Sequence, residues 1–75
     1  MMKLDDMKMG TRARIGHIEG DVRLLTRLAS IGLVPGSTVE VVRNDSHRPM
    51  LVFGRDTLLA VSRRDCRKIE AEEVA

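Results

Sequence analysis

The segment SIGLVPGSTVEVV, residues Ser30–Val42, decides the fold because it joins a helical pattern to a strand pattern through two turns. Gly32 follows the apolar stripe of the preceding residues, at the place where a helix commonly ends on a glycine with positive φ. Pro35 and Gly36 fit the second and third positions of a type II turn. In TVEVV, apolar and polar residues then alternate, which is typical of a strand with one buried face. The segment therefore predicts a helix that ends at Gly32 and a chain reversal into a sheet.

The residues before this segment, DVRLLTRLASIG, predict one α-helix. Leu24, Leu25, Leu28 and Ile31 recur at spacings of three and four and form one apolar stripe. Asp21 precedes the stripe and can accept hydrogen bonds from the free N–H groups of the first turn. A helix of about eleven residues is marginal by itself in water, so the stripe must pack against the rest of the chain.

Short strand patterns surround this helix. TRARIGHI precedes it, TVEVV, MLVF and LLAV follow it, and CRKIEAE closes the chain; GRDT reads as a hairpin turn and SRRDC as one helical turn. Short strands in so small a chain bury a core by curling into a barrel, which also removes exposed sheet edges. Phe53, in MLVF, is expected in that core. The prediction is a mainly β fold, a small barrel of about five short strands with one α-helix between the first and second strands.

Length and composition limit the class of protein. The chain has 75 residues, of which 43% are hydrophobic and 32% charged, and it contains one cysteine. We expect a single domain over residues 1–75, with an ordered core at about residues 4–72, since this length leaves no room for a second domain. One cysteine cannot form an internal disulfide, which favours a reducing, cytoplasmic location. No apolar run approaches the roughly 20 residues of a membrane span, so the chain is not expected to be embedded in a membrane.

Several classes of function lack their sequence signatures. The six glycines are scattered and form no phosphate-binding loop, and no Ser-His-acid arrangement appears, so no enzyme is expected. The net charge is only +2, and the arginines are accompanied by neither stacking aromatics nor a recognition-helix motif, so no nucleic acid is expected as a partner. Phe53 is the sole aromatic residue, which leaves no aromatic-lined groove for proline-rich peptides.

A metal site would have to draw on residues far apart in the sequence. His17, His47 and Cys66 are the weak candidates, and none has a second ligand at the short spacing of strong sites. His17 alternates with Ala13 and Ile15 near a strand end, His47 lies in a polar loop, and Cys66 resembles a small buried hydrophobe. No cofactor is expected, and weak binding of a transition metal ion stays open.

Contact with another protein is the remaining class, and the helix with its following turn is the expected surface. Leu33 and Val34 are apolar residues in a turn where polar ones are usual, although Leu33 also fits a plug for the barrel end. Arginines from the helix and from SRRDC would frame such a patch with charge, as interfaces favour. The predicted partner-binding residues are Arg23, Arg27, Leu33, Val34, Pro35 and Gly36.

The stretch RLASIGLVPGSTVEVV resembles the signature of the ferrous iron transport protein A (FeoA) family, a helix followed by Gly-Leu-x-Pro-Gly and a valine-rich strand. LDDMKMGTRARIGHIEG is similar to the leading strand of that family and LLAVSRRDCRKIEAE to its closing hairpin, so the resemblance runs from about Leu4 to about Glu72.

This resemblance implies an SH3-like β-barrel that serves bacterial ferrous iron uptake as a cytoplasmic, non-enzymatic accessory protein. Its implied partner is the cytoplasmic GTP-binding domain of the membrane iron transporter (FeoB). The same barrel is appended to iron-dependent repressors, so a metal-responsive regulatory domain that binds a transition metal ion directly is the alternative. Weak homo-oligomerisation also stays open.

Overall fold

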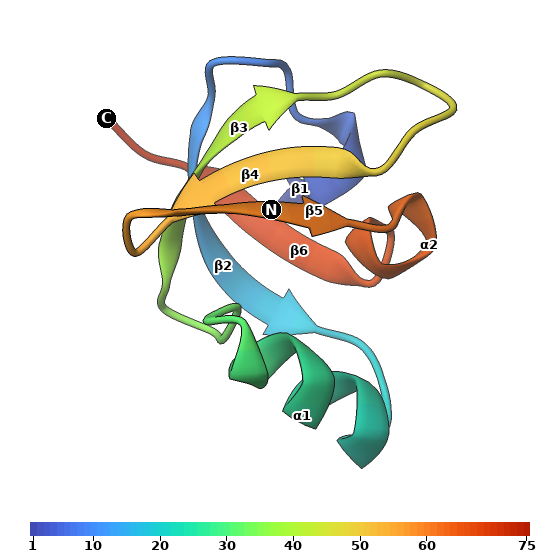
Figure 1. The fold of residues 1–75 in the computed structure, drawn as a ribbon. Helices are drawn as coiled ribbons and strands as arrows, with labels where there is room; N and C mark the ends of the chain where they lie inside the picture. Colours follow the sequence, from blue (N-terminus) through green and yellow to red (C-terminus); the bar gives the residue numbers. More distant parts are fainter.

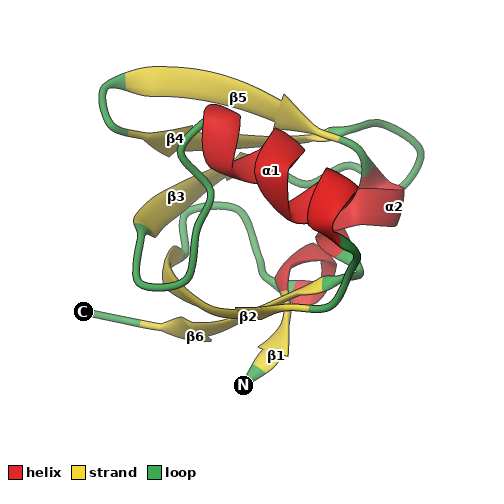
Figure 2. Ribbon diagram, turned by 90° about the horizontal axis from the view of Figure 1, so that it is seen from below, coloured by secondary structure: helices red, strands yellow, loops and turns green.

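Six strands and two α-helices make up the computed structural model, which describes residues 1–75. The strands are β1 (Met2–Lys3), β2 (Arg12–Ile18), β3 (Thr38–Arg43), β4 (Met50–Gly54), β5 (Thr57–Val61) and β6 (Ile69–Glu73). The helices are α1 (Val22–Ser30) and α2 (Arg63–Cys66), and a 3₁₀ helix covers Leu4–Asp6. All strand pairs are antiparallel and form one sheet in the order β1-β6-β2-β3-β4-β5. The sheet curls around the core, and α1 lies across one open end of the curl (Figures 1 and 2).

The predicted mainly β class is confirmed, with one difference in the number of strands. The sequence predicts about five, and the structure has six because Met2 and Lys3 pair with Ala71 and Glu70 of β6. Two residues carry no periodicity, so only the pairing with β6 makes β1 a strand. For the same reason α1 lies between the second and third strands rather than between the first and second. The helical turn expected in SRRDC is α2.

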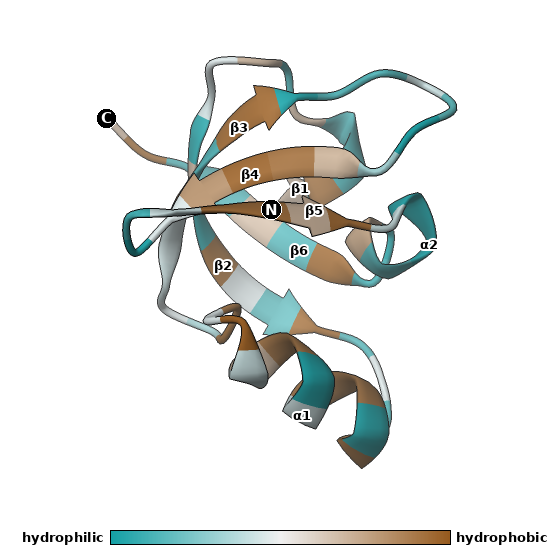
Figure 3. Ribbon diagram, in the orientation of Figure 1, coloured by the Kyte–Doolittle hydropathy of each residue, from teal (hydrophilic) through white to brown (hydrophobic).

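The core contains sixteen buried residues, and none of them is polar or charged. In β3, Val39 and Val41 point inward while Glu40 faces solvent, as the alternation predicts. Figure 3 shows β3 and β4 as mostly hydrophobic, whereas α2 and the loop between β3 and β4 are mostly hydrophilic. Leu24 and Leu28 anchor α1 on the core. Neither helix is long and apolar enough to cross a membrane.

Phe53 corrects one expectation from the sequence, because it lies outside the core with 43% of its surface exposed. The pairing of β4 with β3 places Val52 opposite Val41 on the inner face, so Phe53 must point outward. There it is paired with Glu40 of β3 and Leu58 of β5. In MLVF either set of alternate residues can face the core, and only the strand register decides which one does.

The end of α1 forms as the glycine predicts. Gly32 has a φ of +91°, and its N–H donates to the carbonyl of Ala29 at 3.0 Å. The N–H of Leu33 donates to the carbonyl of Leu28 at 2.9 Å. These two bonds define a Schellman motif, which usually brings its flanking apolar residues together. Leu28 and Leu33 are indeed both buried, so the motif turns Leu33 into the core.

The β4–β5 hairpin turns through two residues that are unusual there. Arg55 and Asp56 have φ values of +53° and +58°. A turn with both central residues in this region favours Asn-Gly, because other L-residues are strained by roughly 1–2 kcal/mol. We therefore expect Asp56→Gly to raise the free energy of unfolding by about 0.5–1 kcal/mol, measured by urea denaturation followed by circular dichroism. Asp56→Ala removes the carboxylate without relieving the strain, and an equal gain in that variant would contradict the explanation.

Candidate docking surface

The turn after α1 is held rigidly against β2. Gly36 has a φ of +95°, and the N–H of Ser37 donates to the carbonyl of Val34 at 3.0 Å, as in the predicted type II turn. The Ser37 hydroxyl donates to the same carbonyl at 2.7 Å. Two further bonds tie the turn to β2: the Gly36 N–H donates to the carbonyl of Ile15 at 2.7 Å, and the Ile15 N–H donates to the carbonyl of Ser37 at 2.8 Å. The conformation of this turn is therefore held by hydrogen bonds within the turn and by hydrogen bonds to Ile15 of β2.

The predicted residues of this turn differ in how much they offer to a partner. Leu33 is only 1% exposed, so it fills the barrel end, as the interpretation of this residue as a plug predicts. Val34 is half-buried, and Pro35 and Gly36 are exposed. The surface available at the turn is therefore Val34–Gly36, with Leu33 as its support from below.

Arg23 and Arg27 lie away from this turn, in a cleft between α1 and α2. The cleft has a volume of about 440 Å³, and Arg64 and Lys68 line it from the side of α2. The Arg27 guanidinium donates to the Asp65 carboxylate at 2.9 Å, which links the two helices. Figure 2 shows the N-terminal end of α1 directed towards α2 and its C-terminal end leading into the turn. Arg23 therefore lies at the opposite end of α1 from the turn, whereas Arg27 lies in the last turn of the helix and is paired with α2.

The second arginine of SRRDC, Arg64, joins this cleft, but its neighbour Arg63 does not. The Arg63 guanidinium donates to the side-chain oxygen of Asn44 at 2.8 Å and to the carbonyl of Asp45 at 2.9 Å. The Asn44 amide in turn donates to the carbonyl of Met7 at 2.7 Å. Arg63 therefore ties α2 to the loop between β3 and β4.

The three candidate metal ligands lie apart. His17 is exposed with its Nε2 3.4 Å from a carboxylate oxygen of Glu19, and His47 is exposed in the loop between β3 and β4. The register of β2 against β6 shifts at Gly16, so His17 points outward instead of continuing the inward face. Cys66 is fully buried. No group of three or more His, Cys, Asp or Glu side chains is arranged to hold a metal ion.

The environment of Cys66 makes its thiol a poor ligand and a poor nucleophile. Burial, helped by the nearby Asp5 and Asp65 carboxylates and opposed by the Arg63 guanidinium, raises the pKa of this thiol from 9.0 to about 12. Only the thiolate binds metals and attacks electrophiles efficiently. At neutral pH the Cys66 side chain therefore behaves as a small apolar group.

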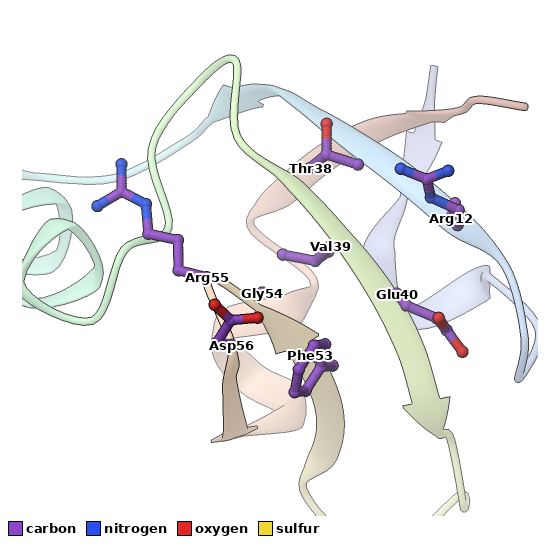
Figure 4. A pocket seen from close by; sticks show the side chains of 8 residues that line it. All are labelled: Arg12, Thr38, Val39, Glu40, Phe53, Gly54, Arg55 and Asp56. Atoms are coloured by element: carbon purple, nitrogen blue, oxygen red, sulfur yellow. The ribbon is translucent and has the colours of Figure 1, made fainter.

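A hollow lies on the outer face of β3 and β4. The sequence alone does not predict it, because Phe53 is expected in the core. Figure 4 shows Phe53 near Glu40 on neighbouring strands, while the side chain of Arg55 extends away from them. Phe53 and its cross-strand neighbour Leu58 are 43% and 55% exposed. Arg12 lines the same hollow from β2. This face combines an apolar centre with charges of both signs.

A small antiparallel sheet curled into a barrel is the architecture of SH3-like domains, and α1 is added to this barrel here. A model of the FeoA domain matches residues 2–73, and the chain belongs to the FeoA family, as the sequence resemblance predicts. Membership in this family implies a role in ferrous iron transport.

Solved structures show the same fold. The crystal structure of an iron uptake regulatory protein (FeoA) has a TM-score of 0.93 at 20% identity, covering 97% of this chain and 97% of that one. The solution structure of the FeoA protein from Chlorobium tepidum has a TM-score of 0.85 at 29% identity, covering 99% of this chain and 71% of that one. ScaR with bound Zn²⁺ has a TM-score of 0.87 at 17% identity, and the match covers 99% of this chain but 37% of that one. No curated protein matches the sequence.

Proposed function

We propose that this chain is a non-enzymatic, cytoplasmic accessory protein of ferrous iron uptake that acts by contact with the cytoplasmic GTP-binding domain of the membrane iron transporter (FeoB). The observation that carries the proposal is the turn Val34–Gly36, which presents an apolar surface and is fixed to β2 by two backbone hydrogen bonds. A rigid surface loses little conformational freedom when it binds, so more of its contact energy appears as affinity. The role of the family in ferrous iron transport supports the transporter as the partner.

A rigid turn also suggests how docking would regulate the transporter. A bound protein shifts a conformational equilibrium only by the difference between its affinities for the two states. Because its hydrogen bonds to β2 hold the turn in one conformation, it would fit one shape of the partner better than another. We propose that the nucleotide bound to the transporter domain selects this shape.

The substitution Val34→Asp tests the docking face. Placing a carboxylate in an apolar contact costs desolvation without a compensating bond, so we expect affinity for the transporter domain to fall at least about tenfold. An amide NMR titration of the labelled protein, run with GDP and with a GTP analogue, measures both the affinity and the residues that shift. Val74→Asp, near the C-terminus, is the matched control and should bind normally. Normal binding by folded Val34→Asp would exclude this face.

The alternative function is a metal-responsive regulatory domain. Its support is the shared fold with ScaR bound to Zn²⁺ and with a manganese-dependent transcriptional repressor. Anaerobic calorimetry with Fe²⁺ and with Mn²⁺ separates the two functions. Stoichiometric binding that is lost in His17→Ala or His47→Ala would favour the alternative.

Weak homo-oligomerisation stays a prediction, and the apolar outer face around Phe53 is the surface that would support it.

A further inference from the structure

Three cations meet at the α1–α2 cleft without an acidic partner in the chain. Arg23 comes from α1, Arg64 from α2, and Lys68 from the residues just after α2, and all three line the cleft. We call them the cleft trio. None of the three takes part in any ion pair of the structure. Like charges that line one cleft repel one another, so the arrangement favours a negatively charged occupant.

The two carboxylates of the same cleft are already engaged. Asp65 is paired with Arg27 at 2.9 Å, and its side chain is only 15% exposed. Asp21 caps α1 by accepting the N–H of Leu24 at 2.9 Å. The lining therefore holds four cations, Arg23, Arg27, Arg64 and Lys68, against these two carboxylates, and the cleft keeps an excess of positive charge.

The cleft is also held in shape. The Arg27–Asp65 pair joins α1 to α2, and the N–H of Asp65 donates to the Ser62 hydroxyl at 3.1 Å at the start of α2. The cleft trio is thus carried by two helices that a charge-assisted bond links. A preformed cluster of this kind binds its ligand without a large ordering cost.

We propose that the α1–α2 cleft receives an acidic segment of the docked protein, with Asp or Glu carboxylates paired to the cleft trio. Arginine binds carboxylates through two parallel hydrogen bonds, and lysine adds a compact charge. The proposal rests on the docking function above and extends it. The cleft runs along α1 from Asp21 to Arg27, and the turn Val34–Gly36 follows the C-terminal end of the same helix, so the partner would carry an acidic segment beside an apolar spot.

The decisive variant reverses the charge of all three residues: Arg23→Glu, Arg64→Glu and Lys68→Glu. The matched control makes the same change in charge elsewhere, with Lys8→Glu, Arg43→Glu and Arg48→Glu, whose side chains form no ion pairs in the chain. Circular dichroism and thermal unfolding first establish that both variants are folded. We expect affinity for the transporter domain to fall at least about tenfold in the cleft variant, with a flatter salt dependence, and by less than about threefold in the control. Equal losses of affinity in the two variants would show that the effect comes from net charge alone and would overturn the proposal.

Small probes identify the chemistry of the occupant. Hexaglutamate should shift the amides of the cleft trio in the unmodified protein and not in the cleft variant. Tighter binding of inorganic phosphate or of a short duplex DNA at the same amides would overturn the acidic-segment assignment.

The outcomes also separate this inference from the docking function. If the cleft variant binds the transporter domain normally while Val34→Asp does not, docking stands and the acidic-segment proposal is wrong. If hexaglutamate binds the cleft but the unmodified protein does not bind the transporter domain, the proposed partner is wrong and the cleft assignment stands.

Discussion

Leu28→Ala is expected to lower the free energy of unfolding by about 3 kcal/mol, within the usual range for a leucine removed from a packed core. Leu28 is 2% exposed and belongs to the buried cluster that joins α1 to the sheet. Its carbonyl also accepts the N–H of Leu33, so the residue lies where the helix, the Schellman motif and the core meet. A domain of 75 residues has a total free energy of unfolding of roughly 4–11 kcal/mol. If the value for this protein lies at the low end of that range, the substitution would remove most of its stability.

Leu25→Ala provides the matched control, because it makes the same substitution in the same helix at a residue that is 37% exposed. Its cost should be below about 1.5 kcal/mol, since less surface is removed from the interior. Urea denaturation followed by circular dichroism at the helical band measures both variants, as the chain has no Trp or Tyr to report by fluorescence. Equal costs at the two positions would show that α1 is not anchored through Leu28.

The stability of the protein is expected to fall at alkaline pH because of Cys66. The unfolded thiol loses its proton above its ordinary pKa of 9.0, whereas burial raises the pKa of the folded thiol to about 12. Between these values the folded state binds more protons than the unfolded state, so each unit of rising pH favours unfolding. The slope approaches about 1.4 kcal/mol per pH unit in this window, and the full stabilisation by the protonated thiol is present below pH 9.

Cys66→Ala removes this slope, so the difference between the two proteins isolates the thiol from the lysines, which titrate in both. Denaturation at several pH values between 8 and 11 measures it. The same burial should keep the native thiol unreactive towards iodoacetamide at neutral pH, with labelling only after urea is added. Parallel pH profiles of the two proteins, or rapid labelling of the native state, would contradict the burial of Cys66.

The docking model gives the two ends of α1 different tasks. At one end the turn Val34–Gly36 offers an apolar contact, and at the other the cleft trio offers positive charge. Apolar contacts chiefly set the rate of dissociation, whereas charges chiefly set the rate of association and its dependence on salt. Val34→Asp and the cleft variant should therefore change different rate constants for the same partner.

The sequence by itself determined the features that depend on neighbouring residues. Asp21 caps α1, and Gly32 and Gly36 take the positive φ values that their turns require. In β3, Val39 and Val41 face the core as their alternation predicts. These features follow from sterics and hydrogen bonds within a few residues, which any chain with this local sequence would share.

Only the tertiary structure decided which parts of these elements face outward and which meet. Phe53 lies outside because the register against β3 assigned the inner face to Val52, and β1 exists only through its pairing with β6. The sequence is compatible with either a surface or a core position for Leu33, and the closed barrel places it in the core. The cleft trio joins residues from α1 with residues near α2, some forty positions later, and no local pattern records such a meeting. Its physical reason is the packing of both helices on one shared core, which is a property of the whole chain and not of any segment.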